Sequence, residues 1–260
     1  MSIGVVIPVC IPSSQLEPRF GHLQRVVLEV LHQLGPLDCC IVADDGSAPA
    51  VRDYLSAVEA ANQRRFSVQF RPQEDGAPAR PWRVASSRNL GASRVEIYTR
   101  PEAFVFLDAD CLPGCVWFEA FRRFLAIDGG LSKADVVFGK IDAQTGHGDE
   151  IQKDLRSPNR MGGARRLACL FERGGGGNLF VTRDHFRGAG GFDETYDGGF
   201  GWEETDFAVR AYEMGAEVLY SDDAAVTHLW HPRGKEHFLN IERNRALFQS
   251  QTRLFAGGRA

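Results

Sequence analysis

The chain has 260 residues, of which 43% are hydrophobic and 25% are charged, an ordinary composition for a soluble protein of one large α/β domain or two small ones. A formal net charge of -4 argues against nucleic acid as the main partner, because proteins that bind it present a basic face. No apolar segment approaches the roughly 20 residues of a membrane span, so we expect any membrane contact to be peripheral.

The cysteines and the N-terminus bear on the cellular compartment. None of the six cysteines belongs to a C-x2-C pair of the zinc type, and several lie in apolar runs where a free thiol behaves as a small hydrophobe. The N-terminus lacks the basic start and longer apolar stretch of a signal peptide. We therefore expect reduced cysteines and a cytoplasmic protein.

The start of the chain predicts a parallel α/β unit. A β-branched run at 3–9 predicts a buried strand, helical spacing predicts a helix over 22–34, and a second apolar run predicts a strand at 39–43. An amphipathic helix from about 51 to 64 and an alternating strand at 66–71 follow. Strand, helix and strand in this order build a parallel sheet.

Two acids, Asp44 and Asp45, follow the second predicted strand. With Gly46 and Ser47 they are ordinary residues of a strand-to-helix turn, so a turn and a contact to a nucleotide base or ribose are equally supported at this point. After a Pro-rich loop, a helix is expected to begin near Arg88. The Arg88 guanidinium has three possible roles: binding a diphosphate, pairing with a carboxylate of a metal site, or lying at the surface.

The segment 103–114 carries the central chemical signal. An apolar run of strand length ends in Asp108 and Asp110, and Pro113-Gly114 then turns the chain away. Residues i and i+2 of a strand point to the same side, so both carboxylates are predicted to address one ligand beyond the strand end. Ligands of open α/β sheets lie there, and paired oxygens suit Mg²⁺ or Mn²⁺. A turn cap is the alternative.

The second half of the chain combines core elements with glycine. A helix with an aromatic core stripe is expected over 116–127, a strand over 135–141 and a mobile polar surface loop over 143–160. Four glycines at 174–177 precede Asn178 and a short strand. This arrangement favours a shaped pocket wall over a flexible loop.

Three acids, Glu203, Glu204 and Asp206, fall in the first turn of the next predicted helix. The helix dipole favours acids there whatever their function. Three acids directly after a segment rich in glycine and aromatic residues are more than are needed to cap the start of the helix. One of them is therefore a candidate general base.

Two histidines, His228 and His231, follow a late strand expected at 216–220. A structural role is the ordinary one for a histidine. In a chain that also holds a carboxylate pair, His-x-x-His-Pro-Arg is a candidate metal or phosphate site. The tail from 236 to 255 is expected to be helical.

Taken in order, the motifs resemble the GT-A fold glycosyltransferases of the family 2 type, and the second half is similar to their galactosyltransferase-like and polypeptide-GalNAc-transferase-like C-terminal segment. Each piece is weak alone, whereas the ordered set, over about 3–235, is specific. The matching pieces are Val-Val-Ile-Pro-Val in the first strand, Ala-Asp-Asp-Gly-Ser at 43–47, Ser-Arg-Asn-Leu-Gly at 87–91, Asp-Ala-Asp at 108–110, Gly-Gly-Phe-Asp-Glu at 190–194 and Trp-Glu-Glu-Thr-Asp-Phe-x-x-Arg at 202–210.

The resemblance implies a single GT-A catalytic domain over 1–260, with a Rossmann-like, mixed, mostly parallel α/β sheet flanked by helices. It implies a nucleotide-binding half over about 1–112, an acceptor-binding half over about 113–235 and a helical tail over about 236–260. The implied activity is metal-dependent, inverting transfer from a nucleotide sugar, most often UDP-linked, to a hydroxyl of a discrete acceptor such as a glycan, a metabolite, a lipid-linked sugar or a peptide.

For the metal and the phosphates, the resemblance implies Mn²⁺ or Mg²⁺ bound by Asp110 and His228. Asp108 is implied to face the ribose, or to reach the metal through water. His231 and Arg233 are assigned to the phosphates, and which histidine binds the metal is left open.

For the nucleotide, the resemblance implies that the backbone near Pro8 forms part of the base pocket. One acid of the first pair binds the base, and Asp45 is favoured over Asp44, although both stay open. Arg88 is assigned to the donor.

For the acceptor, Glu204 stands where the family usually has the aspartate that acts as general base in inverting members. The resemblance therefore implies that Glu204 deprotonates the acceptor, with a longer side chain and an altered reach. The residues assigned to acceptor or sugar binding are Gly177, Asn178, Trp202, Glu203 and Asp206.

The alternatives are a retaining GT-A transferase, a nucleotidyltransferase-like protein and a sugar-nucleotide-binding protein without activity. A nucleotidyltransferase is expected to carry a Gly-rich, basic signature near its first strand, whereas 8–20 has Arg19 as its only basic residue. A silent binding domain is expected to have lost its acids, whereas Asp108, Asp110 and Glu204 are all present.

Overall fold

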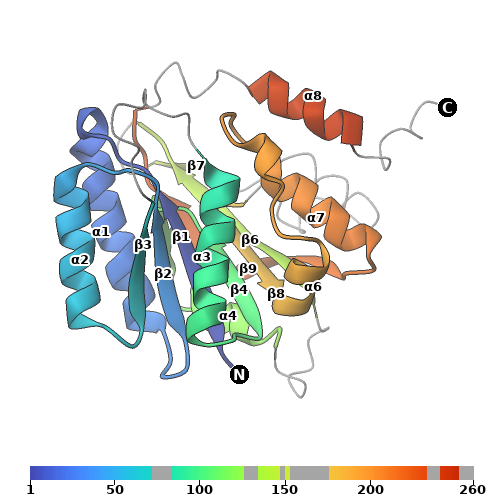
Figure 1. Ribbon diagram of the computed structural model, residues 1–260, viewed down its shortest axis with the longest axis horizontal. Helices are drawn as coiled ribbons and strands as arrows, with labels where there is room; N and C mark the ends of the chain where they lie inside the picture. The colour runs from blue at the N-terminus through green and yellow to red at the C-terminus, as the bar shows by residue number, and fades with distance from the viewer. Residues whose placement is uncertain (72–82, 126–133, 147–149, 153–175, 233–240, 252–260) are drawn as a thin grey trace.

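A computed structural model describes residues 1–71, 83–125, 134–146, 150–152, 176–232 and 241–251 (Figure 1). None of the described helices is long and apolar enough to cross a membrane. The strands are β1 (Ile3–Val9), β2 (Cys39–Asp44), β3 (Phe66–Phe70), β4 (Ala103–Leu107), β5 (Cys111–Pro113), β6 (Val136–Gln144), β7 (Ile151–Gln152), β8 (Asn178–Thr182) and β9 (Val218–His228). The α-helices are α1 (Leu16–Gln33), α2 (Pro49–Ala61), α3 (Val84–Tyr98), α4 (Trp117–Arg122), α6 (Arg183–Gly188), α7 (Glu203–Glu213) and α8 (Ile241–Gln251).

The strands join in one mixed sheet in the order β3-β2-β1-β4-β8-β6-β9-β5, with β7 paired to β6. Strands β3, β2, β1 and β4 are parallel, β8 is antiparallel to both β4 and β6, and β9 is parallel to β6. Most strands therefore point the same way, while β8, β5 and β7 run against them. The predicted α/β class with a mixed, mostly parallel sheet is confirmed.

Helices cover both faces of the sheet and pack their apolar sides against it. In β1, Val5 and Ile7 belong to the core shared with α1, α2 and α4, whereas Val6 belongs to the core shared with α3, α6 and α7. Because both faces are covered, the central strands are apolar throughout, and the strands predicted at 3–9 and 39–43 are confirmed. In Figure 1, α3 lies in front of the sheet, and α8 lies beyond α7 at the end opposite the N-terminus.

Helix α3 approaches β1 very closely because its buried side carries small residues. A Cβ on Gly91 would overlap Cγ1 of Val6, and a Cβ on Gly4 would overlap Cγ1 of Val95. Only glycine fits at these two positions. The close approach fixes Arg88, one turn earlier on the same buried side of α3, next to the residues that follow β4.

The polar loop predicted at 143–160 is in part a strand pairing. Strand β6 continues to Gln144, which pairs with Ile151 of β7, and the N–H of Thr145 donates to the carbonyl of Glu150 at 2.9 Å. Backbone hydrogen bonds hold this pairing of β6 with β7, which therefore needs no apolar run that a sequence pattern would detect. The remainder of the predicted loop, at 147–149 and 153–160, lies outside the described residues.

The strand predicted at 216–220 extends further than expected. It runs through His228 as β9, because it pairs with β6 along its length, with a register shift between Gly139 and Ile141. The helix predicted over 116–127 is shorter than expected, since α4 ends at Arg122. The helical tail is confirmed for the part described, as α8.

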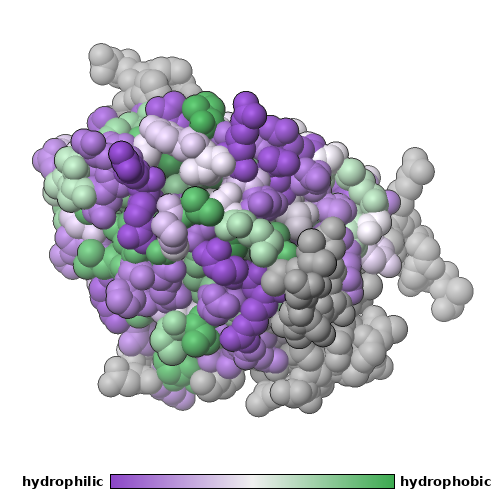
Figure 2. Space-filling view, turned by 90° about the horizontal axis from the view of Figure 1, so that it is seen from below, coloured by the Kyte–Doolittle hydropathy of each residue, from purple (hydrophilic) through white to green (hydrophobic). Residues whose placement is uncertain are grey.

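Asp38 ties three segments together at the end of the sheet where the strands begin. Its side chain is buried, accepts the N–H of Ile3 at 2.9 Å and that of Gly35 at 2.7 Å, and pairs with Arg122 of α4. Figure 2 shows this end of the molecule, where hydrophilic side chains predominate and apolar ones form small separate groups.

Asp38→Ala is expected to lower the free energy of unfolding by about 3 kcal/mol, because two buried N–H groups and a guanidinium lose their acceptor. Urea unfolding followed by circular dichroism measures this change. Asp53→Ala, at an exposed position of α2, is the matched control and is expected to change the free energy by less than about 0.5 kcal/mol. Equal stability of the two variants would contradict the role of Asp38.

Candidate functional site

The two acids after β4 face different partners. Strand β4 ends at Leu107 and the chain turns at once, with the N–H of Cys111 donating to the carbonyl of Asp108 at 3.0 Å. The alternation of a strand therefore does not extend through Asp110, and the assignment of both carboxylates to one ligand stays a prediction. Asp108 faces α3, and Asp110 faces the end of β9.

Asp110, His228 and His231 form a cluster whose possible ligand atoms all lie within 4.8 Å of one another. Oδ2 of Asp110 is 3.0 Å from Nε2 of His231, and Oδ1 is 3.7 Å from Nε2 of His228. Backbone pairing holds the cluster in place: Cys111 pairs with His228, and the N–H of Leu229 donates to the carbonyl of Asp110 at 2.8 Å. Both histidines thus stay candidates for a metal ligand.

The chemistry of the cluster fits a divalent transition cation. One carboxylate and two imidazoles suit Mn²⁺ better than Mg²⁺, since Mg²⁺ prefers oxygen ligands. Burial raises the pKa of Asp110, but the hydrogen bond with His231 and the electrostatic effect of both histidines outweigh burial, and the pKa falls to about 2. Asp110 is therefore ionised at neutral pH and ready to bind a cation.

Arg88 connects the end of β4 to the second acid pair. Its side chain is 2% exposed, and it donates to Oδ1 of Asp108 at 3.0 Å and to Oε1 of Glu203 at 2.8 Å. The guanidinium also lies over the ring of Phe192, 5.3 Å from its centroid. Of the three roles considered for Arg88, the structure shows the pairing with a carboxylate, and its terminal nitrogens are engaged within the protein rather than facing a donor phosphate.

Glu203 and Glu204 open α7, and both are buried. Oε1 of Glu204 accepts the N–H of Gly176 at 3.2 Å. A Cβ on Gly176 would lie 2.6 Å from Cβ of Glu204, and a Cβ on Gly177 would lie 2.8 Å from Oδ2 of Asp108. Glycine therefore lets the backbone at 176–177 pass close to Glu204 and Asp108. A shaped pocket wall, as predicted from the sequence, needs such a close approach.

Burial and its neighbours affect the protonation of Glu203. Burial and the neighbouring Glu204 carboxyl raise the pKa of Glu203 well above its usual range, although the charge of Arg88 opposes them. A buried pair of carboxyls favours a state with one proton, because two adjacent negative charges repel.

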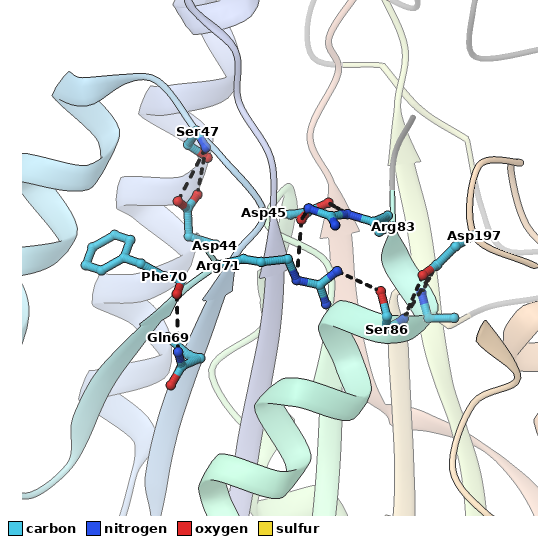
Figure 3. Close-up of polar contacts among 10 residues, drawn as sticks. Asp44, Asp45, Ser47, Gln69, Phe70, Arg71, Arg83, Ser86 and Asp197 are labelled. Carbon is cyan, nitrogen blue, oxygen red and sulfur yellow. Dashed lines mark hydrogen bonds and ion pairs between the residues drawn. The ribbon is translucent and has the colours of Figure 1, made fainter. Parts of the chain in front are cut away.

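Asp45 faces two arginines, as Figure 3 shows. Arg83 approaches with two nitrogens, with Nε at 3.2 Å from Oδ2, and Nε of Arg71 lies 3.6 Å from Oδ1. Arg71 also donates to Oγ of Ser86 at 3.0 Å. Arg71, Arg83 and Ser86 line a cavity of about 480 Å³, so Asp45 lies beside a polar space.

Asp44 caps a turn, and Pro8 lies inside a strand. Oδ1 of Asp44 accepts the N–H of Ser47 at 3.1 Å. This contact is the turn interaction that the sequence allowed for Asp44 and Asp45. Pro8 is buried within β1, opposite Ala43 of β2. The assignment of the base to Asp45 rather than Asp44 stays a prediction.

Asn178 and Asp206 use their side chains inside the protein rather than in a pocket. Oδ1 of Asn178 accepts from Nε1 of Trp117 at 2.8 Å, and its amide donates to two backbone carbonyls at 3.1 and 2.7 Å. Asp206 pairs with Arg210 at 2.8 Å. These contacts hold β8 and α7, so the geometry does not support the assignment of either side chain to the acceptor.

Trp202 precedes α7 in a left-handed conformation, with φ at 79°, and its ring packs against Phe248 at 5.1 Å between centroids. Its assignment to the acceptor stays a prediction. Arg233 lies outside the described residues, and so does its assignment to the phosphates.

Several neighbours of the site have no sequence signal. Arg71 and Arg83 flank the Pro-rich loop, and no spacing rule connects them to Asp45. His22 of α1 lies close enough to Asp110 to respond to its charge, while burial lowers the pKa of the imidazole. Packing of α1 near β5 brings His22 there.

Comparison with known structures shows which fold this is. The crystal structure of GalNAc-T7 with UDP, GalNAc and Mn²⁺ is similar with a TM-score of 0.68 and 16% identity, over 96% of this chain and 48% of that one. The mannosyltransferase PcManGT from Pyrobaculum calidifontis, in complex with GDP-Man and Mn²⁺, gives 0.61 and 14%, over 96% and 62%. S. aureus TarS gives 0.65 and 15%, over 96% and 39%.

These likenesses show the fold alone, and the chain has the GT-A fold. It spans between 39% and 62% of the length of the three chains. No protein-family model and no curated protein matches the sequence.

Proposed function

We propose that the protein is a metal-dependent glycosyltransferase that moves a sugar from a nucleotide sugar to a hydroxyl of a discrete acceptor. The observation that carries the proposal is the placement of the Asp110, His228 and His231 cluster at the carboxyl end of β4, joined through Asp108 and Arg88 to the buried acid pair of α7. Two structures with this fold support it, because they hold UDP or GDP-Man together with Mn²⁺.

The cluster and Asp45 are assigned to different parts of the donor, the cluster to the diphosphate and Asp45 to the base. When bound at the cluster, a divalent cation supplies Lewis-acid stabilisation of the charge that develops on the leaving diphosphate. Asp45 offers an acceptor and the adjacent arginines offer donors, which matches the N–H and carbonyl groups on the edge of uracil. We assign Asp45 as the residue that binds the base. We assign UDP as the nucleotide because the family that the motifs resemble most often uses UDP-linked donors and because GalNAc-T7 holds UDP.

The transfer step is assigned to Glu204. Glu204 takes the proton of the acceptor hydroxyl as the hydroxyl oxygen bonds to the anomeric carbon. The bond from that carbon to the diphosphate oxygen breaks, and the nucleoside diphosphate leaves with the electron pair. Attack from the face opposite the leaving group inverts the anomeric centre.

The two halves expected from the sequence carry over as part of the proposal. Residues of about 1–112 supply most of the donor site and those of about 113–235 most of the acceptor site, with a helical tail after 236. His228 and His231 belong to the second half by sequence and contact Asp110 of the first. The donor site therefore needs both halves.

Thermal shift with UDP, GDP, CDP and dTDP, each with Mn²⁺, is expected to show the largest stabilisation with UDP, since ligand binding to the native state raises the melting temperature. Incubation with UDP-sugars and hydroxyl acceptors is then expected to release UDP. A large shift with GDP and none with UDP would overturn the donor assignment. Stabilisation by UDP without consumption of any UDP-sugar across an acceptor panel would indicate a binding protein instead.

A further inference from the structure

We propose that Asn244, in α8, is a positioning residue for the acid pair of α7, and that the C-terminal helix thereby sets the geometry of the acceptor side. The inference rests on the proposed function. In Figure 1, α8 lies beside the segment that leads into α7. No sequence motif included Asn244.

The segment before α7 reverses direction through unusual backbone conformations. Gly198 has a φ of 83°, Gly201 of 71° and Trp202 of 79°. A positive φ is costly for a bulky residue such as tryptophan and persists only where the surroundings hold it. Glu203 follows directly, so the contacts that hold this reversal also place the first residue of the acid pair.

Asn244 holds both ends of the reversal with one amide group. Its side chain is fully buried, at 0% exposure, and Nδ2 donates to the carbonyl of Tyr196 at 3.0 Å and to that of Gly201 at 2.9 Å. A Cβ on Gly199 would lie 2.6 Å from Cγ of Asn244, so the amide sits against the bare backbone of the segment. Among the residues that the structure describes, the hydrogen bonds of the Asn244 side chain involve two backbone carbonyls and Arg243, none of which is assigned to the donor or to the reaction.

Neighbouring residues of α8 reinforce this contact. Arg243 donates to the carbonyl of Thr195 at 2.8 Å and to that of Asp197 at 3.1 Å, and Phe248 packs on the ring of Trp202. The segment is therefore attached to α8 at several successive residues.

The opposite side of the segment is attached to α3. Oδ1 of Asp197 accepts the N–H of Ala85 at 2.9 Å, and Asn89 donates to the carbonyl of Phe192 at 2.9 Å. Helix α3 also carries Arg88, which bonds to Glu203. The acid pair is thus positioned from two sides, by α3 through Arg88 and by α8 through Asn244.

Asn244→Ala is expected to lower kcat/KM for the acceptor by about tenfold or more, because small displacements of a catalytic group weaken its alignment with the substrate. Binding of UDP with Mn²⁺, measured by calorimetry, is expected to stay within about twofold of wild type, since the cluster and Asp45 lie on other elements. Hydrogen exchange of amides 198–206 is expected to become faster. Arg245→Ala, on the exposed side of the same helix, is the matched control and is expected to change none of these.

A second pair of variants tests the same contact without relying on Asn244→Ala alone. Gly199→Ala is expected to lower acceptor kcat/KM, because the added methyl group meets the Asn244 amide. Combining it with Asn244→Ala removes the clash and is expected to recover part of the loss. If the two substitutions acted independently, their losses in kcat/KM would multiply, and the double variant would be worse than either single variant.

The outcomes separate this inference from the proposed function. If the wild type transfers sugar and Asn244→Ala transfers it equally well, the inference is overturned while the function stands. If Asn244→Ala loses UDP binding as well as acceptor turnover, the inference is also overturned, because the substitution then affects the whole site and not the acceptor side alone. If the wild type transfers no sugar, the proposed function fails, and unchanged exchange at 198–206 in Asn244→Ala then overturns the positioning role as well.

Discussion

Glu204→Gln is expected to lower the turnover of sugar transfer by about a thousandfold, the range typical of a lost general base. Glutamine has nearly the same shape, and its carbonyl oxygen can still accept the N–H of Gly176, but it cannot take a proton from the acceptor. Binding of UDP with Mn²⁺ is expected to stay within about twofold of wild type, because the change affects the transition state alone.

Single-turnover assays at saturating donor and acceptor measure the chemical step for Glu204→Gln. Glu213→Gln, at the exposed end of the same helix, is the matched control and is expected to retain wild-type turnover. A Glu204→Gln enzyme that keeps most of its turnover would show that another group removes the proton, and would remove the main support for inversion through Glu204.

Asp110→Asn is expected to weaken Mn²⁺ binding by at least about a hundredfold, because the variant loses the one anionic ligand of the cluster. The two imidazoles that remain carry no negative charge to offset the cation. UDP affinity is then expected to become indifferent to Mn²⁺, whereas in the wild type it is expected to rise with added metal.

Calorimetric titration of Mn²⁺, with and without UDP, measures both effects. His228→Ala and His231→Ala are expected to weaken Mn²⁺ binding as well, each by less than Asp110→Asn, and their ranking identifies the stronger ligand. Asp223→Asn, at a position of β9 whose carboxylate is 70% exposed, is the matched control. Wild-type Mn²⁺ affinity in Asp110→Asn would remove the cluster from the mechanism.

The sequence by itself determined the central elements and the edge of the sheet at which the candidate site residues lie. The apolar runs at 3–9, 39–43 and 103–107 became central strands, because a strand covered by helices on both faces must be apolar throughout. Polar residues directly after such runs fall at one edge of a parallel sheet, which placed Asp45 and Asp110 correctly. These are local properties, and local pattern is enough to identify them.

The tertiary structure alone decided how these residues are paired. Arg88 meets Glu203 because α3 packs closely on β1, and His228 meets Asp110 because β9 pairs with β5. Strand β7 and the part of β9 beyond Tyr220 depend on backbone partners elsewhere in the chain, so local sequence did not predict them.

The same reason explains the residues whose roles changed. The resemblance assigned Asn178 and Asp206 to the acceptor or sugar, whereas their side chains bond to Trp117 and Arg210 inside the protein. Asn244 lies in no motif and holds the segment before Glu203. A sequence pattern records burial, turns and charge, whereas the partner of a side chain is set by strand register and helix packing between distant segments, which only the folded chain specifies.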